Sequence, residues 1–287
     1  MTTDQAQPAV RTYRDIRGWF SRTDARLFKG ILESQRDAAP GDLVEIGAFM
    51  GKSAVVIGHH LRRGERFVVI DLFGDMSLLG QSSEDDANRA ENKSSYPRLT
   101  RERFEANYLS IHDELPVVVQ APSDRIMEHV APGSVRFVHV DASHLYAPVA
   151  EDCRSVKKML RAGGVVAFDD WRNMKCPGVA AAIWESVATD GLIPVAVSPN
   201  KLYAVHDGAD DVVAALRSIT DADPDWWLVT EHQIMGHAVL GVDNVHAAEK
   251  RRAAKKAQRA PAAPRPATPP PAGLAARVRT RLRRALG

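Results

Sequence analysis

Short apolar runs alternate with longer stretches of mixed polarity over the first 205 residues of the chain. Apolar runs of this length, bounded by turn residues, are typical of buried strands. Seven runs fit this description, at residues 43–46, 67–70, 116–120, 135–140, 165–168, 193–197 and 202–205. The last two flank the turn-forming sequence Ser-Pro-Asn-Lys, so they predict an antiparallel hairpin that closes the pattern.

The stretches between these runs carry apolar residues at helical spacing. Helices are predicted within residues 11–38, 53–61, 146–160 and 179–189. Strands that alternate with helices form mostly parallel sheets with helices on both faces. We therefore expect an α/β, Rossmann-like fold with a seven-stranded, mostly parallel sheet, helices on both faces and a C-terminal antiparallel hairpin strand.

The pattern also divides the chain into segments. Residues 1–40 are expected to form a helical cap on a domain at 41–208, in which the polar segment 75–110 is a lid insertion. Residues 209–247 are expected to be a helical extension. Residues 248–287 hold 12 Lys or Arg, one Glu and six prolines, which predicts a disordered basic tail.

The tail explains the formal net charge of +2, because the other residues carry 26 Lys or Arg against 35 Asp or Glu. Such a tail would suit an anionic partner, and nucleic-acid binding is one alternative function. The acidic body does not favour it, so no nucleic-acid partner is predicted. No apolar run is long enough to span a bilayer, and the N-terminus lacks a signal-peptide pattern. The two cysteines, Cys153 and Cys176, do not suggest a disulfide framework, and a cytoplasmic location is expected.

A glycine loop follows the first predicted strand, in the sequence Glu45-Ile-Gly-Ala-Phe-Met-Gly-Lys-Ser53. It ends as a nucleotide-phosphate loop does, but Gly47 and Gly51 enclose three residues where that loop needs four. The dinucleotide fingerprint fails as well, because Ala48 takes the place of its second glycine. Neither a phosphate-loop nucleotide nor a dinucleotide is therefore the expected ligand.

Two acidic residues suggest a different ligand. Glu45 lies inside the first strand, where a compact loop beside it would suit a cationic amino-acid group. Asp71 ends the second strand, where a carboxylate can accept both hydroxyl protons of a ribose. A nucleoside joined to an amino acid fits this arrangement, and S-adenosylmethionine (SAM) is such a molecule.

These residues resemble the first motifs of the class I SAM-dependent methyltransferases, over about residues 40–206. The resemblance implies a cofactor site that is formed by four parts of the chain. They are the glycine loop, the acidic residue that would bind the ribose, the motif after the third strand and the end of the fourth strand. These residues are Glu45, Gly47, Ala48, Gly51, Ser53, Asp71, Ser123, Asp124 and Asp141. For Ser123 and Asp124, a role as helix caps is an equal alternative.

Acidic residues also end the fourth and fifth predicted strands, at Asp141 and at Asp169-Asp170. The carboxyl ends of parallel strands open onto one crevice, so the three carboxylates are expected to converge there. Like charges so close repel one another unless a cation lies between them, and a hard divalent ion, Mg²⁺ or Mn²⁺, prefers oxygen ligands. His144 follows Asp141 at the edge of the crevice and would suit a general base. Taken singly, Asp141 and Asp170 would more often be helix caps than ligands.

The pair Asp141-x-x-His144 with Asp169-Asp170 is similar to the metal-dependent small-molecule O-methyltransferases, and most of all to bacterial sugar O-methyltransferases. Those enzymes act on macrolide deoxysugars and on actinobacterial polysaccharides. The resemblance implies Asp141, Asp169 and Asp170 as metal ligands, and His144 with Asp141 as catalytic residues. Catechol-type relatives have lysine as the base, so His144 favours the sugar group.

The expected enzyme is thus a SAM-dependent, divalent-metal-assisted O-methyltransferase that acts on a saccharide hydroxyl, and a homo-oligomer is one expected assembly. The alternatives are a catechol-like acceptor, a nucleic-acid methyltransferase that uses the basic tail, and an oligomeric scaffold or nicotinamide enzyme. His139 is expected to be a buried core residue. Four aromatic residues would either line the acceptor pocket or pack in the core, namely Trp19, Phe20, Tyr96 and Tyr108.

Overall fold

The computed structural model describes residues 10–96 and 98–250, apart from the side chains at 84 and 91–95. By internal contacts the chain divides into two units, residues 1–247 and 248–287. The fold described below belongs to the first unit. The predicted basic tail lies outside the described residues except for its first three positions.

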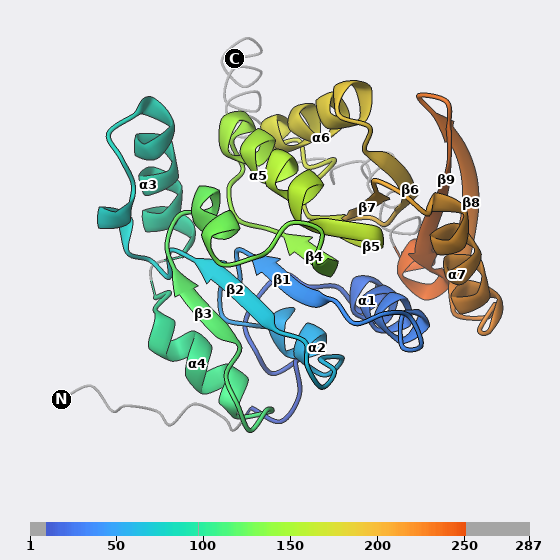
Figure 1. The fold of residues 1–287 in the computed structure, drawn as a ribbon, viewed down its shortest axis with the longest axis horizontal. Coiled ribbons are helices and arrows are strands. Elements are labelled where there is room, and N and C mark those ends of the chain that lie inside the picture. Colours follow the sequence, from blue (N-terminus) through green and yellow to red (C-terminus); the bar gives the residue numbers. More distant parts are fainter. Residues whose placement is uncertain (1–9, 97, 251–287) are drawn as a thin grey trace, which may run out of the picture. The chain divides into compact units, whose positions relative to one another are not determined.

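A single mixed sheet forms the centre of this unit (Figure 1). Its strands are β1 (Asp42–Ile46), β2 (Phe67–Asp71), β3 (Val117–Gln120), β4 (Val135–Val140), β5 (Leu160–Phe168), β6 (Ile193–Val197), β7 (Leu202–Val205), β8 (Trp227–Ile234) and β9 (His237–Asn244). Their order across the sheet is β3-β2-β1-β4-β5-β7-β6-β9-β8. The prediction of seven strands is therefore too low by the two strands β8 and β9.

Strands β3, β2, β1, β4 and β5 pair in parallel, and β7 is antiparallel to both β5 and β6. The first seven strands thus confirm the Rossmann-like sheet and its closing hairpin. Strand β5 begins at Leu160, earlier than the predicted start at residue 165, and the helix before it ends at Met159, one residue before the predicted end.

Helices cover both faces of the sheet (Figure 1). They are α1 (Arg22–Ser34), α2 (Ala54–Gly58), α3 (Ser83–Ser95), α4 (Arg101–Leu109), α5 (Tyr146–Met159), α6 (Pro177–Thr189) and α7 (Ala209–Asp221), with short 3₁₀ helices η1 (Met76–Leu78) and η2 (Ser123–Glu128). Buried residues of α1, α2, α4 and α7 belong to one core cluster, and those of α5, α6 and η2 belong to another. The sheet separates two cores, as expected for a parallel sheet.

Helix α1 illustrates how the sequence specifies these elements. The Ser21 side chain accepts a hydrogen bond from the backbone N–H of Asp24, which caps the helix. Leu27, Phe28 and Ile31 then lie on the face that packs on the sheet, and all three are buried. The predicted N-terminal cap is therefore one helix after an irregular start, with its apolar face in the core.

The segment at 209–247 corrects the prediction of a helical extension. Helix α7 occupies its first part, but β8 and β9 form an antiparallel hairpin in the second part. Met235 and Gly236 turn the chain, and both have positive φ, at 52° and 84°. Two-residue hairpin turns with positive φ at both positions favour Asn-Gly or Asp-Gly. Because the turn here is Met-Gly, the sequence did not predict the hairpin. Strand β9 pairs with β6 and extends the sheet at that edge.

The predicted lid at 75–110 contains η1, α3 and α4. Helix α4 packs into the core through Phe104 and Tyr108.

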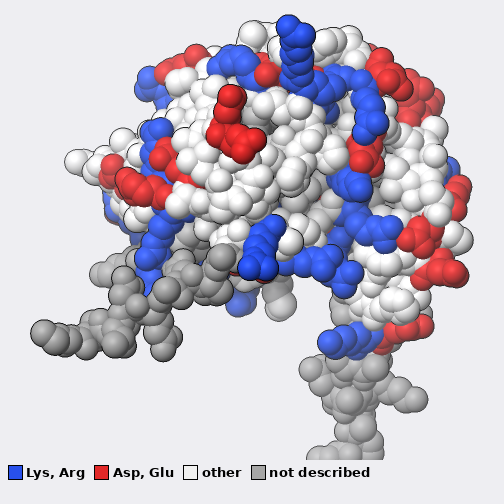
Figure 2. Space-filling model, turned by 90° about the horizontal axis from the view of Figure 1, so that it is seen from below, with Lys and Arg blue, Asp and Glu red and all other residues white. Residues whose placement is uncertain are grey.

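On the face seen in Figure 2, basic and acidic side chains of the described residues are interspersed. Among the described residues, every helix is too short or too polar to cross a membrane.

Candidate active site

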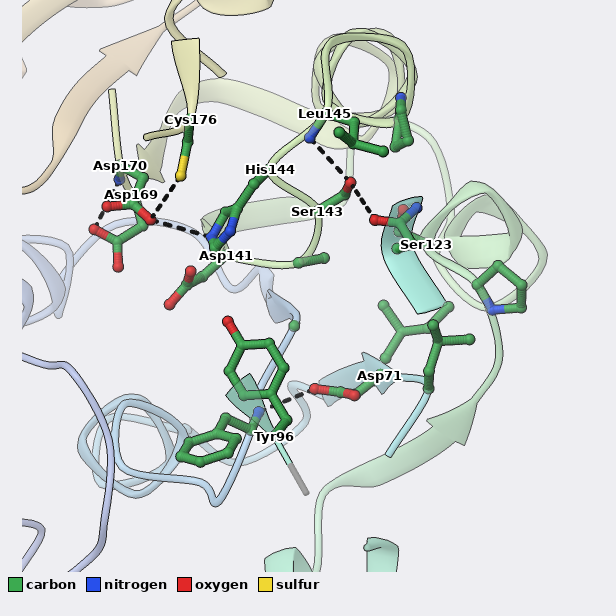
Figure 3. A pocket seen from close by; sticks show the side chains of 18 of the residues that line it. Asp71, Tyr96, Ser123, Asp141, Ser143, His144, Leu145, Asp169, Asp170 and Cys176 are labelled. Atoms are coloured by element: carbon green, nitrogen blue, oxygen red, sulfur yellow. Dashed lines mark hydrogen bonds and ion pairs between the residues drawn. The ribbon is translucent and has the colours of Figure 1, made fainter. Parts of the chain in front are cut away.

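The carboxyl ends of β1, β2, β4 and β5 border a cavity of about 980 Å³ (Figure 3). Eight of the predicted site residues line it, namely Gly47, Asp71, Ser123, Asp124, Asp141, His144, Asp169 and Asp170. The other four, Glu45, Ala48, Gly51 and Ser53, do not line it. The structure therefore brings three predicted features to a single cavity: Asp71, the Ser123–Asp124 pair after the third strand, and the acidic cluster of Asp141, Asp169 and Asp170.

The glycine loop positions the carboxylate of Asp71. Backbone N–H groups of Ala48 and Phe49 donate to Asp71 Oδ2 at 2.7 and 2.9 Å, and that of Phe73 donates to Oδ1 at 2.7 Å. Burial raises the pKa of Asp71, and these three hydrogen bonds offset part of that rise because they favour the charged form. Ala48 thus acts through its backbone, by fixing Asp71 at the edge of the cavity.

Gly47 allows the loop after β1 to contact the end of β4. Its φ is +81°, and a Cβ atom there would lie 2.1 Å from the backbone oxygen of Asp141. Any side chain would clash with that backbone, so this position requires glycine. The close contact at Gly47 therefore helps to fix the position of the Asp141 backbone at the end of β4.

Glu45 points away from the cavity into the buried interior. Its Oε1 lies 2.8 Å from Nδ1 of His139, and both side chains are almost fully buried. Burial raises the pKa of Glu45 to about 8, although Ser53 and Lys201 act in the opposite direction. Glu45 is thus part of a buried polar network and does not line the cavity, whereas Gly47 and Phe49 of the glycine loop do.

Lys201 is the centre of that network and is the main residue that sequence reasoning missed. It is only 1% exposed, and its Nζ lies 2.8 Å from His139 Nε2 and 2.8 Å from Asp169 Oδ2. Because the ammonium group can only donate, His139 Nε2 must accept, and Nδ1 carries the proton that is donated to Glu45. Burial lowers the pKa of His139 well below its ordinary value, so this ring is neutral.

The charge of Lys201 is stabilised by the acidic residues around it. Burial alone would lower the pKa of Lys201, but the nearby carboxylates of Asp169, Asp141 and Asp24 outweigh burial and raise it. In the sequence Lys201 ends a turn motif, where a solvated side chain is the ordinary expectation. Only the pairing of β7 with β5 brings it beside the end of β5.

Asp141 and Asp169 lie side by side at the ends of β4 and β5. Burial raises the pKa of Asp141 well above its ordinary value, and the charge of Asp169 and a hydrogen bond between the two carboxyl groups add to that rise. Two carboxylates this close require a shared proton or a cation between them. Lys201 supplies one positive charge, which pairs with Asp169 at 2.8 Å and also acts to lower the pKa of Asp141.

Asp170 is turned toward a different set of partners. Its Oδ2 lies 3.1 Å from His144 Nε2, and its Oδ1 accepts from Asn173 Nδ2 at 3.0 Å. The residue has φ +55°, an uncommon conformation for a residue with a side chain. Burial would raise the pKa of Asp170, but the hydrogen bonds from His144 and Asn173 outweigh burial and lower it.

The three predicted metal ligands are therefore divided between two groups of close donor atoms. Asp141 and Asp169 lie with His139, and Asp170 lies with His144 and Cys176; within each group the donor atoms are within 4.8 Å of one another. His139 has both ring nitrogens engaged by Glu45 and Lys201, so it is not available as a ligand. Cys176 was not predicted as part of the site.

Aromatic side chains form the wall of the cavity opposite the acidic cluster. The ring of Phe49 lies 5.4 Å from that of Trp19 and 5.3 Å from that of Tyr96, between ring centres. Trp19 is 69% exposed at the edge of the cavity. Tyr108 instead packs in the core, and Phe20 is buried although part of it borders the cavity. The two predictions for these aromatics, pocket or core, thus each hold for some of them.

The fold and the loop–Asp71 arrangement agree with those expected for a class I SAM-dependent methyltransferase. Residues 44–171 match a family model described as a methyltransferase domain, which confirms the enzyme class expected from the sequence. That match spans the loop, Asp71 and the acidic cluster as far as Trp171. No curated protein matches the chain.

Several solved structures are similar in fold. The O-methyltransferase NovP is 19% identical, with a TM-score of 0.48 over 64% of this chain and 80% of its own. CalS11, a calicheamicin methyltransferase, is 20% identical, with a TM-score of 0.45 over 63% of this chain and 78% of its own. TomG of Streptomyces achromogenes is 17% identical, with a TM-score of 0.40 over 66% of this chain and 82% of its own. Likenesses of this degree do not bear on the acceptor.

Proposed function

We propose that the protein transfers the methyl group of SAM to a hydroxyl group of a saccharide, with the help of a divalent metal ion. The observation that carries this proposal is the position of Asp141, Asp169, Asp170 and His144 along one cavity, opposite Asp71. This arrangement combines a nucleoside site with a site that can deprotonate a hydroxyl. Methylation on oxygen needs such deprotonation, because a neutral hydroxyl is a poor nucleophile.

The cofactor would occupy the side of the cavity formed by the ends of β1 and β2. Asp71 keeps lone pairs free for the ribose hydroxyls even with three backbone donors, because each carboxylate oxygen accepts more than one hydrogen bond. Ser123 and Asp124 line the same side and would face the adenine. The methionine part would then extend past Gly47 toward Asp141.

His144 is suited to receive the proton of the acceptor hydroxyl. Its imidazole lines the cavity, is 18% exposed and is paired with Asp170 at 3.1 Å. That pairing orients the ring and stabilises the imidazolium that forms when the proton arrives. As the acceptor oxygen bonds to the methyl carbon, the carbon–sulfur bond would break, and S-adenosylhomocysteine with an uncharged thioether sulfur would be the leaving group.

The chemistry of the acidic cluster fits a hard divalent ion. Asp141 and Asp169 have close carboxyl groups whose repulsion is only partly relieved by Lys201, and all their donor atoms are oxygens. Asp141, Asp169 and Asp170 would hold Mg²⁺ or Mn²⁺. When bound, such an ion would act as a Lewis acid that lowers the pKa of the acceptor hydroxyl.

The aromatic wall supports a saccharide as the acceptor. An exposed Trp19 beside Phe49 and Tyr96 offers flat apolar surfaces, while Asp85 and Asn88 offer hydrogen-bond partners on the same cavity. A sugar ring presents apolar C–H faces and polar hydroxyl edges, so it matches both kinds of surface. A catechol-like acceptor would use the aromatic surfaces but few of the polar ones.

A panel of acceptors would test this proposal. Purified protein, SAM and Mg²⁺ would be incubated with nucleotide-linked deoxysugars, mannose oligosaccharides and catechols, and the methylated products identified by mass spectrometry and NMR. O-methylated saccharide is the expected product. Turnover of catechols alone would refute the saccharide acceptor, and methylation on nitrogen would refute the O-methyl transfer.

A further inference from the structure

His144, Asp170 and Cys176 bring three different donor atoms together at the cavity (Figure 3). His144 Nε2 lies 3.1 Å from Asp170 Oδ2, and Cys176 Sγ lies 4.0 Å from the same oxygen. All three donor atoms are within 4.8 Å of one another, and all three residues line the cavity. The three ligands of a tetrahedral metal ion with one open position have a similar arrangement.

We propose that His144, Asp170 and Cys176 form a binding site for a thiophilic divalent cation such as Zn²⁺, which shares only Asp170 with the all-oxygen ligand set of Asp141, Asp169 and Asp170. A nitrogen, an oxygen and a sulfur donor favour Zn²⁺ or Co²⁺, whereas Mg²⁺ prefers oxygen donors alone. The fourth position would face the cavity and would hold water. Ion binding would release the thiol proton of Cys176 to solvent, while Asp170 binds as a carboxylate and His144 as neutral imidazole.

Cys176 is well placed to become a thiolate ligand. It occupies the N-cap position of α6, a helix of 13 residues. The partial positive charge at a helix N-terminus stabilises an anion there, and this effect favours a metal-bound thiolate. The side chain is 6% exposed overall but borders the cavity, so an ion can reach it from the cavity and not from the outer surface.

Asp170 is held in an orientation that suits the site. Its positive φ and the hydrogen bond from Asn173 to Oδ1 fix the carboxylate, so that Oδ2 faces both His144 and Cys176. Strained backbone of this kind is commonly found at functional sites. Asp170 therefore presents one oxygen to the thiophilic site and is shared with the all-oxygen set, whereas Asp141 and Asp169 belong to the all-oxygen set alone.

Occupancy of this site would inhibit methyl transfer, a consequence that rests on the proposed function. A bound Zn²⁺ would take His144 away from its role as base and Asp170 away from Mg²⁺. The rate of methyl transfer would then depend on the ratio of Zn²⁺ to Mg²⁺. Zinc binding itself requires only the three named donors, so it can be tested without any acceptor.

Cobalt titration of the full chain gives the direct test, because a thiolate bound to Co²⁺ produces a sulfur-to-metal charge-transfer band in the near ultraviolet. Cys153→Ser is a matched control, since Cys153 and Cys176 are the only cysteines of the chain and Cys153 is buried away from the cavity. We expect the band in the wild type and in Cys153→Ser, its displacement by Zn²⁺, and its loss in Cys176→Ser. Absence of the band from the wild type, or its persistence in Cys176→Ser, would overturn the proposal.

A second measurement does not depend on how well Cys176→Ser folds. Cys153→Ser has a single thiol, whose rate of reaction with a thiol reagent can be followed with Zn²⁺ and with Mg²⁺. We expect at least a tenfold slower reaction with Zn²⁺ and little change with Mg²⁺. Equal rates with and without Zn²⁺ would overturn the proposal, whereas the proposed methyl transfer would still be judged by the acceptor panel.

Discussion

Lys201 offers a sharp test of how the site is held together. The residue is buried, and its ammonium group is paired with Asp169 at 2.8 Å. Lys201→Met keeps a side chain of similar length but removes the charge. Asp169, which is 9% exposed, would then lose its counter-charge in the interior, and His139 would lose its donor.

The size of the effect follows from this geometry. Two unit charges at 2.8 Å attract by roughly 6 kcal/mol at an effective dielectric constant of about 20, and the desolvation of both groups offsets part of this attraction. Removal of one partner of such a buried pair costs about 3–5 kcal/mol, because the remaining charge is unpaired. The melting temperature of a domain of this size would fall by about 6–20 °C.

Urea denaturation followed by circular dichroism would measure the free energy of unfolding. Lys157→Met is the control, because Lys157 forms a surface pair with Asp190 at 3.9 Å and should cost less than about 1 kcal/mol. The double variant Lys201→Met/Asp169→Asn should be more stable than Lys201→Met, because Asp169 then no longer carries an unpaired charge. A loss below about 1 kcal/mol in Lys201→Met, or a double variant less stable than it, would refute the reasoning.

Three further predictions concern the loop, the buried network and the aromatic wall. Gly47→Ala should destabilise the protein by more than about 1 kcal/mol in urea denaturation, because its Cβ would meet the backbone of Asp141 at 2.1 Å. Gly133→Ala is its control, with positive φ but open space around it, and equal losses would contradict the steric argument. Glu45 has a pKa of about 8, above its ordinary value of 4.5, so its contribution to stability is present below pH 4.5 and is lost as the pH rises through 8. The wild type should therefore lose stability relative to Glu45→Gln over that range, and parallel curves of unfolding free energy against pH would exclude a raised pKa. Trp19→Ala should raise the KM for the acceptor by about 2–10-fold and leave that for SAM unchanged, and the opposite pattern in steady-state kinetics would place Trp19 at the cofactor.

Local sequence patterns were sufficient to predict those helices and strands that are determined by residues close to one another in the chain. The apolar runs predicted strands β1 to β7, and the motif spacing predicted that Asp71, Asp141 and Asp169 border a common cavity. The direction of a side chain was harder to predict. Glu45 lies on a strand whose side chains alternate between faces, and its carboxylate faces His139 rather than the cavity.

Contacts between distant parts of the chain account for what the sequence did not predict. Lys201 reaches Asp169 only because β7 inserts beside β5, and a turn motif carries no sign of that pairing. The β8–β9 hairpin was missed because its Met-Gly turn lacks the usual polar residue. Cys176 lies at the start of α6, and the fold brings this helix end close to His144 and Asp170. The spacing of these residues in the sequence did not predict that they meet.

The acidic cluster is proposed to activate a hydroxyl group for methylation. The most direct measurement is the rate of methyl transfer from SAM to a saccharide acceptor as free Mg²⁺ is raised after chelation, in the wild type and in Asp141→Asn. We predict that the wild-type rate falls to background in chelator and recovers with Mg²⁺, and that Asp141→Asn stays near background throughout. A wild-type rate that is unchanged in chelator, or an Asp141→Asn rate equal to it, would contradict the claim.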